Sequence, residues 1–122
     1  SGGALIIGSD TLLYRLVFNL VENAIRYSRP GSTVNVSICD NNSHVFLRVE
    51  DQGPGIPKQY RESIFQPFFR LDKSRSRAYG GAGLGLALVW EIAALHGGTV
   101  EVEASSKNGT TMLATLPKRT AA

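Results

Sequence analysis

An arrangement that occurs twice constrains the fold of this chain most: an apolar helix followed by two strands. The first unit is predicted to hold a helix over residues 9–28 and strands over 33–39 and 45–50. The second is predicted to hold a helix over residues 83–98 and strands over 99–104 and 110–117. Antiparallel hairpins that share helices on one side pack as two layers. The sequence therefore predicts an α+β fold, a two-layer sandwich with a mixed, mostly antiparallel sheet covered on one face by helices.

Residue periodicity separates the faces of these elements. On a helical wheel, one broad apolar face of the first helix holds Leu13, Val17, Leu20, Val21, Ala24 and Ile25. A polar face within roughly 140° of arc holds Asn19, Glu22, Asn23, Arg26 and Tyr27. Alternation in the following strand predicts that Val34, Val36 and Ile38 point inward. We also expect a short edge strand over Ala4–Ile7.

Length and composition indicate a single domain over residues 1–122. The first four residues, SGGA, resemble a cloning remnant. One cysteine, Cys39, excludes an internal disulfide framework, and no apolar run reaches the ~18 residues that a membrane span needs. The net charge of +3 resides in the basic segment Arg70–Ala82, which suits a polyphosphate or an acidic partner but is also typical of a solvated loop. Without a second basic patch, we expect no nucleic-acid binding.

Two glycine-rich segments flank this basic segment: DQGPGIP (Asp51–Pro57) and GGAGLGLA (Gly80–Ala87). The alternating glycines of the second segment lie at a predicted helix start, where backbone N–H groups favour phosphate. Neither segment has the spacing of a dinucleotide-binding fingerprint or of a Walker A loop. A glycine cluster at a helix cap is often structural, so each segment alone leaves both interpretations open.

Three further groups of residues have alternative interpretations. Asp51 suits an exocyclic amine such as that of adenine, and equally suits a simple turn cap. Asn19 and Asn23, one helical turn apart, suit a hard cation such as Mg²⁺, or plain solvation of a helix. The phenylalanines of the segment IFQPFFR (Phe65, Phe68 and Phe69) favour a place in the core, or anchor the base of the basic loop.

Taken together, four segments resemble one family. NLVENAIRY resembles the N box, EDQGPGIP the G1 box, IFQPFFR the F box and GGAGLGLA the G2 box of bacterial two-component sensor histidine kinases. All four occur in the expected order, and the resemblance covers about residues 9–117. It implies the catalytic and ATP-binding domain of such a kinase, with the Bergerat fold of the GHKL superfamily and ATP or ADP and Mg²⁺ as cofactors.

The resemblance also implies residue roles. The implied catalytic residues are Glu22, Asn23 and Arg70. The implied nucleotide-binding residues are Asn19, Asn23, Arg26, Tyr27, Asp51, Gly53, Gly55, Ile56, Phe65, Phe68, Arg70, Gly81, Ala82, Gly83, Leu84, Gly85 and Leu86. Asn23, supported by Asn19, would hold the metal, and Glu22 would be the base. Asp51 would bind the adenine amino group, and residues 70–82 would form the ATP lid. Ala82 departs from the Thr or Ser that is common in the family, and we expect binding to survive this change.

The implied function is transfer of the γ-phosphoryl group of ATP to a histidine on a separate dimerisation and phosphoacceptor domain. No phosphoacceptor motif occurs in this chain. One alternative is a GHKL-type ATPase that drives a conformational clamp, and another is a nucleotide-binding module without turnover. Clamp ATPases typically carry Glu where this chain has Asn19, which favours the kinase. The implied partners are the helical domain and a response regulator. The resemblance implies a monomeric isolated domain, a homodimeric parent and a cytoplasmic position below a bacterial inner membrane.

Overall fold

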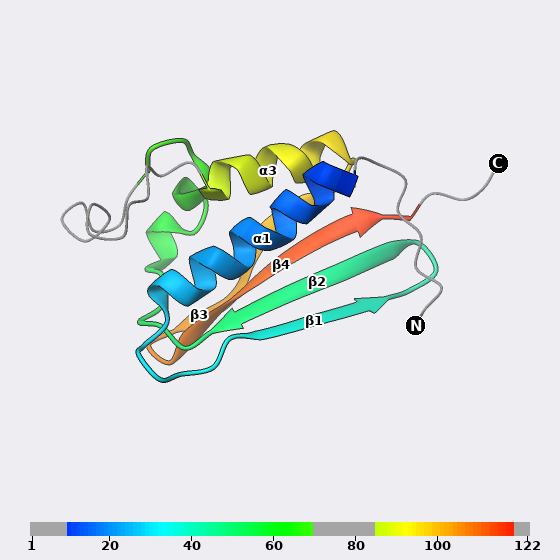
Figure 1. The fold of residues 1–122 in the computed structure, drawn as a ribbon. Coiled ribbons are helices and arrows are strands. Elements are labelled where there is room, and N and C mark those ends of the chain that lie inside the picture. Colours follow the sequence, from blue (N-terminus) through cyan, green and yellow to red (C-terminus); the bar gives the residue numbers. More distant parts are fainter. Residues whose placement is uncertain (1–9, 70–84, 119–122) are drawn as a thin grey trace.

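The computed structural model describes residues 10–69 and 85–118 (Figure 1). Its regular elements are α1 (Asp10–Tyr27), β1 (Asn35–Asp40), β2 (His44–Asp51), α3 (Gly85–Leu95), β3 (Thr99–Ser106), β4 (Gly109–Pro117) and the 3₁₀ helices η1 (Lys58–Tyr60) and η2 (Ser63–Phe65). The two predicted helices and both hairpins are confirmed. The two 3₁₀ turns, η1 and η2, follow β2 in place of a continuous helix. The strand predicted for Ala4–Ile7 and the whole of the predicted ATP lid, residues 70–82, lie outside the described residues.

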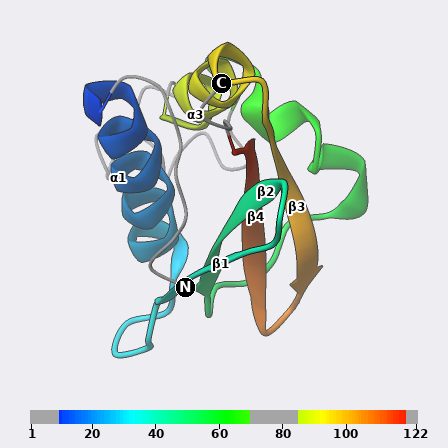
Figure 2. The same cartoon turned by 90° about the vertical axis from the view of Figure 1, so that its right-hand side faces the viewer.

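The four described strands form one antiparallel sheet in the order β1-β2-β4-β3. Both α-helices lie on the same face of this sheet, as Figures 1 and 2 show. α1 packs over β2, α3 packs over β3 and β4, and the two helices contact each other. The predicted two-layer α+β sandwich is therefore confirmed. Within the described ranges, no helix is both long and apolar enough to cross a membrane.

The core fills the space between the helices and the inner face of the sheet. Its fully buried members include Leu16, Leu20, Val49, Val89, Ile92 and Val100. Alternation holds along β2, since Val45, Leu47 and Val49 are all buried. These side chains are opposed across the sheet by inner-face residues of β4, so the central pair of strands forms the floor of the core.

Two residues of β1 lie on the predicted face of the sheet but are not buried there. Val36 and Ile38 share the inner face with Val49 and Leu47, their partners across the strand pair, yet they are 47% and 66% exposed. The reason is position: β1 is an edge strand of the described sheet, and α1 packs over β2 instead. For the same reason Ile25, predicted on the apolar face of α1, is 63% exposed, whereas Leu16 takes the central buried position.

The C-terminal end of α3 is closed by a glycine pair. Gly97 has φ of +75° and donates its N–H to Ala94 O at 3.0 Å, while Gly98 donates to Ala93 O at 2.8 Å. These two bonds make a Schellman motif, in which Gly97 ends the helix. A Cβ on Gly98 would lie 2.2 Å from Thr115 O. The glycine pair therefore lets the chain turn directly from α3 into β3 against the β4 backbone.

Candidate functional site

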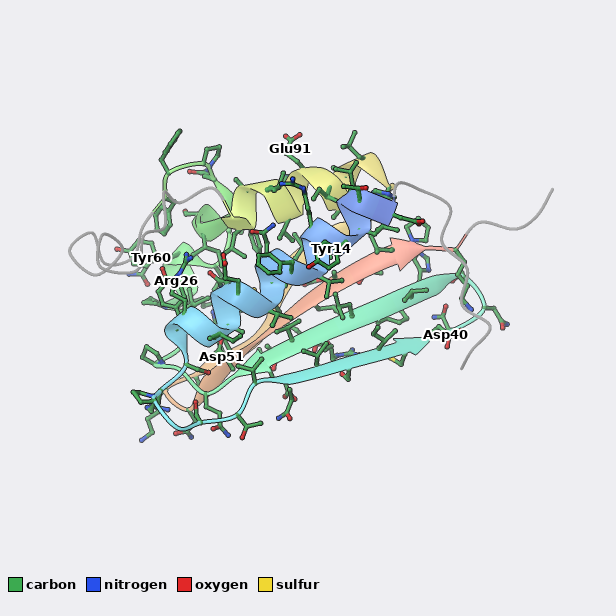
Figure 3. All side chains as sticks on the ribbon, viewed as in Figure 1. Tyr14, Arg26, Asp40, Asp51, Tyr60 and Glu91 are labelled. Carbon is green, nitrogen blue, oxygen red and sulfur yellow. The ribbon has the colours of Figure 1, made fainter. Side chains whose placement is uncertain are left out.

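Two polar residues named from the sequence, Arg26 and Asp51, lie at one end of the sandwich. In Figure 3, Arg26 near the end of α1 and Asp51 at the end of β2 lie toward the same end of the molecule, together with Tyr60. Asp40 lies at the opposite end of the sheet. This convergence follows from topology, because α1 ends and β2 ends next to each other, and Gln52 connects the two.

Gln52 joins the G1 segment to the end of α1 through both main-chain and side-chain bonds. Its N–H donates to Ser28 Oγ at 3.0 Å, and its carbonyl accepts from Arg29 N at 3.3 Å and from Arg29 Nη1 at 3.0 Å. Its side-chain Oε1 accepts from Thr33 N at 3.1 Å. The residue after Asp51 is therefore held against the helix end by four hydrogen bonds.

Asp51 is a buried carboxylate, with 9% of its surface exposed. Its Oδ1 accepts hydrogen bonds from Gly53 N at 2.9 Å and from Thr110 N at 3.2 Å. Burial raises the pKa of Asp51 above its ordinary value, and the two backbone hydrogen bonds oppose this rise. Because both bonds use Oδ1, Oδ2 is the oxygen that can accept from a ligand amine. The turn-cap and amine-binding interpretations of Asp51 are thus compatible, one for each oxygen.

Gly53 and Gly55 of the G1 segment lie so close to neighbouring backbone carbonyls that no side chain fits there. A Cβ on Gly53 would lie 2.3 Å from Tyr27 O, at the end of α1. Gly55 has φ of +88°, and a Cβ there would lie 2.2 Å from Ser106 O on β3. The segment therefore passes tightly between α1 and β3, and Ile56 follows it with its side chain packed partly into the core.

Asn19 and Asn23 lie on the side of α1 that faces α3. Asn19 donates its amide N–H to Arg15 O at 2.8 Å, which fixes the orientation of the amide group. A Cβ on Gly85 would lie 3.4 Å from Asn19 Oδ1, so this oxygen faces the first turn of α3. Asn23 follows one turn later and is half-buried. Amide oxygens are hard donors of the kind that Mg²⁺ accepts alongside phosphate oxygens and waters.

A metal site made wholly of charged ligands is not present in the described part of the chain. Within it, no group of three or more His, Cys, Asp or Glu residues is placed to hold a metal ion. The asparagine pair therefore fits a cation whose remaining ligands come with the substrate and from water, as is usual for Mg²⁺ bound to a nucleotide.

Glu22 and Arg26 form a pair on the exposed flank of α1. Arg26 Nη2 lies 3.4 Å from Glu22 Oε1, and the two side chains are 25% and 47% exposed for Arg26 and Glu22 respectively. An exposed i,i+4 pair with this separation contributes little stability, about 0.3–0.5 kcal/mol. Both side chains can therefore exchange this contact for another at small cost, which keeps both of their predicted roles open.

The F box divides between the core and the surface. Phe65 is buried and packs against Trp90 of α3, with ring centroids 5.4 Å apart. Phe69 is half-buried against Tyr60 at 5.7 Å. Phe68 is 68% exposed and has φ of +65°, in the left-handed region that aromatic residues rarely adopt. The core interpretation thus holds for Phe65, whereas Phe68 is exposed two residues before the undescribed segment.

Of the remaining predicted residues, some lie within the described ranges and others lie outside them. Gly85 is the first residue of α3, and Leu86 packs partly against the core. Tyr27, the last residue of α1, is 38% exposed. Five predicted residues lie outside the described ranges: Arg70, Gly81, Ala82, Gly83 and Leu84.

A polar hollow with a volume of about 360 Å³ lies beside Asp51 at the hairpin end of the sheet. Glu50, Thr111 and Asn35, from the outer face of three strands, line it together with the β3–β4 turn. Its described lining residues include no lysine or arginine. This described lining offers no positively charged side chain to a phosphate, and neither Asn19 nor Asn23 is part of it.

Sequence analysis missed four residues that support the site: Gln52, Arg61, Ser105 and Thr110. Thr110 was placed only in a strand, yet it is buried to 4% exposure and bonds Asp51. The sequence around Thr110 does not indicate this hydrogen bond, because its partner Asp51 is 59 positions away in the chain. Gln52 was visible only as a member of the G1 segment.

The fold and the candidate site are those of a Bergerat-type domain: Asp51 is buried at the end of β2, and Asn19 of α1 faces the first turn of α3. The chain belongs to the family of histidine kinase-, DNA gyrase B- and HSP90-like ATPases, whose sequence profile matches residues 8–120. The family is thereby confirmed, and with it the ATP-binding class of domain.

Proteins similar to this chain in sequence include sensor kinases. The sensor-like histidine kinase SenX3 of Mycobacterium tuberculosis (strain ATCC 25618 / H37Rv) is 45% identical over 112 residues, which is 92% of this chain and 27% of SenX3. The sensor protein RstB of Escherichia coli (strain K12) is 49% identical over 98 residues, 80% of this chain and 22% of RstB. This chain therefore spans about a quarter of the length of these relatives.

Solved structures agree with this assignment. The mycobacterial sensor histidine kinase MprB superposes with a TM-score of 0.80 at 37% identity, covering 95% of this chain and 76% of that one. Full-length ShkA, solved in complex with AMPPNP, superposes with a TM-score of 0.81 at 28% identity over 98% of this chain and 24% of ShkA. The α+β architecture is thus the one that histidine kinase catalytic domains share.

Proposed function

We propose that this chain is the catalytic and ATP-binding domain of a sensor histidine kinase, extending over residues 1–122. It binds ATP with Mg²⁺ and delivers the γ-phosphoryl group to a histidine on a separate helical domain. The observation that carries the proposal is the junction of α1 and α3, where Asn19 Oδ1 faces the first turn of α3. A hard oxygen donor and a helix N-terminus at one place suit a metal-bound polyphosphate.

Each side chain of the site has a part in this proposal. Asn23 and Asn19 hold the metal, which neutralises phosphate charge when it is bound. Asp51 Oδ2 accepts from the adenine amino group, while Gly53 and Gly55 shape the adenine pocket. Arg26 and Arg70 contact the phosphates, and Tyr27 lies against the nucleoside. Phosphoryl transfer requires mainly positioning and charge stabilisation, which these groups supply.

The distinction between a kinase and a clamp ATPase depends on where a base is held. In this chain the carboxylate is Glu22, adjacent to Asn23, while the position four residues before Asn23 is Asn19. Glu22 is 47% exposed in its side chain, and its polar contact among the described residues is the long one to Arg26, so it is accessible to an incoming partner. This favours proton transfer from a partner's histidine over activation of a water inside a closed site.

The partners follow from the same proposal. The phosphoacceptor histidine belongs to a dimerisation domain of the parent protein, which passes the phosphoryl group to a response regulator. The isolated domain is monomeric and the parent is a homodimer whose catalytic domain is in the cytoplasm, below a bacterial inner membrane. The sensor-kinase names of relatives that are several times longer than this chain support these assignments.

The test separates nucleotide binding from transfer. Asn23→Ala is expected to weaken Mg-ATP binding at least tenfold and to abolish its Mg²⁺ dependence, as measured by calorimetry with and without EDTA. Glu22→Gln is expected to bind ATP normally and to slow labelling of the supplied phosphoacceptor domain by about 10²-fold, the usual contribution of a general base.

Matched controls are Asn42→Ala in the β1–β2 turn and Glu91→Gln on the outer side of α3, where Figure 3 shows Glu91 pointing away from the sheet. Both are expected to behave as the unsubstituted chain. Normal phosphoryl transfer by Asn23→Ala would overturn the metal assignment. Rapid ATP hydrolysis by the chain alone, unaffected by Glu22→Gln, would favour the clamp ATPase.

A further inference from the structure

The polar groups of the Ile56 backbone are held by two side chains from outside the G1 segment. Ile56 N donates to Ser105 Oγ at 2.8 Å, and Ile56 O accepts from Arg61 Nε at 3.2 Å. Arg61 Nη2 also donates to Ser105 O at 3.2 Å. The guanidinium group therefore bridges the carbonyls of Ile56 and Ser105, and the end of the G1 segment is fastened to β3 by three hydrogen bonds.

An irregularity in β3 places Ser105 where it can make these bonds. The register with β4 runs Val102↔Met112, Ala104↔Thr111 and Ser105↔Thr110, with a shift between Val102 and Ala104. Glu103 is thus an extra residue in the strand, a β-bulge. In an unbroken alternation from Val102, Ser105 would point to the outer face. The bulge instead turns it to the inner face, beside Thr110.

From Ser105 the hydrogen bonds continue to Asp51. Ser105 Oγ lies 2.8 Å from Thr110 Oγ1, and Thr110 N donates to Asp51 Oδ1 at 3.2 Å. Thr110 is buried, so a lost partner there is not replaced freely by water. The chain of contacts from Arg61 through Ile56, Ser105 and Thr110 thus reaches the carboxylate at which the adenine amino group is expected to bind.

We propose that Ser105 and Arg61 are positioning residues that set the distance between the Asp51 carboxylate and the Ile56 backbone, and so determine selectivity for adenine over guanine. This inference rests on the proposed ATP function. Neither side chain needs to touch the nucleotide. They act by fixing the positions of the Asp51 carboxylate and the Ile56 backbone. A site whose polar groups are fixed discriminates strongly against a base whose donors and acceptors do not match them.

The experiment compares affinities for Mg-ATP, Mg-GTP and inorganic tripolyphosphate by calorimetry. Ser105→Ala and Arg61→Met are each expected to reduce the ratio of ATP to GTP affinity about fivefold, the effect of one neutral hydrogen bond. Tripolyphosphate affinity is expected to stay unchanged, because that ligand does not reach the base pocket. Ser105→Thr, which retains the hydroxyl group, is expected to restore the ratio.

Controls separate positioning from general destabilisation. Ser106→Ala and Lys58→Met remove a neighbouring hydroxyl group and a neighbouring charge, and they are expected to leave the ratio unchanged. Thermal unfolding identifies any variant that fails to fold. The comparison of the ATP to GTP affinity ratio between Ser105→Thr and Ser105→Ala then tests the positioning role. An unchanged ATP to GTP ratio in folded Ser105→Ala, or a parallel loss of tripolyphosphate affinity, would overturn the inference alone. If the unsubstituted chain itself bound ATP and GTP equally, the adenine role of Asp51 would fall with it.

Discussion

The backbone N–H of Thr110 donates to Oδ1 of Asp51 at 3.2 Å, although the two residues are 59 positions apart in the chain. This bond ties the end of β2 to the start of β4 at the base of the expected adenine pocket. It also holds the Asp51 carboxylate in a buried position, where desolvation disfavours the charged form and raises the pKa. The same contact therefore connects nucleotide recognition with the stability of the empty domain.

Asp51→Asn is expected to stabilise the nucleotide-free domain at neutral pH while weakening its preference for ATP. The pKa of Asp51 is raised in the folded chain, so the stability associated with this group is fully present below its unfolded pKa and is lost as pH rises through the folded value. The advantage of the variant should thus grow from about pH 4 upward, as measured by urea denaturation across pH. Glu50→Gln, on the exposed face of the same strand, is the control. A pH-independent difference would contradict the raised pKa.

Lys118→Met is expected to lower stability at pH 7, and less so in acid. Lys118 Nζ lies 2.5 Å from Asp40 Oδ2, and this contact lowers the pKa of Asp40 below 3.8. A depressed carboxyl pKa contributes stability above the unfolded value that is lost as pH falls through the folded value. The difference in melting temperature should therefore shrink below about pH 4. Lys107→Met in the β3–β4 turn, an exposed lysine, should show no such pH dependence.

Gly53→Ala is expected to destabilise the domain by about 1–3 kcal/mol and to weaken ATP binding at least tenfold. The new Cβ would lie 2.3 Å from Tyr27 O, which is backbone and must move together with the end of α1. Gly31→Ala is the matched control, because it has φ of +78° and open space around the added atom. It should lose about 1–2 kcal/mol through backbone strain alone and keep its ATP affinity. Equal ATP affinity in both variants would exclude the close approach as a determinant of the site.

Phe68→Asn is expected to stabilise the domain by about 1 kcal/mol, because asparagine tolerates the left-handed conformation better than phenylalanine does. The side chain is 68% exposed, so little packing is lost. Phe18→Asn makes the same change at an exposed phenylalanine in regular helix and should be mildly destabilising. Denaturant titration of the two variants measures the difference. A loss of stability at Phe68 equal to that at Phe18 would show that the backbone there is unstrained.

The fold was predictable because its periodic segments are long. Eighteen residues of α1 and the alternation in β2 each repeat their pattern often enough to identify the element. Val36 and Ile38 show where such patterns fail. Alternation indicates which side chains share a face, but whether another element covers that face depends on tertiary packing, and β1 lies at an edge that α1 does not cover.

The candidate site residues that could be grouped from the sequence are those that lie on a single helix. Asn19, Asn23 and Glu22 could be assigned to one side of a single helix from the helical period alone. Ser105 and Arg61 could not, because their contacts join elements that are distant in sequence and depend on the irregular register of β3. Residues that support a site from another strand leave no periodic signal.

The bulge at Glu103 also changes what kinds of mutation the domain can accumulate. Replacing Glu103 by another residue removes its ion pair with Arg48 but leaves the number of residues in β3 unchanged. Deleting Glu103 would remove the bulge and would still leave Ala104 opposite Thr111 and Ser105 opposite Thr110, so Ser105 would keep its inward position. Through evolution this strand should therefore accept both a change of side chain at position 103 and the loss of that residue, because Ser105 stays opposite Thr110 in either case.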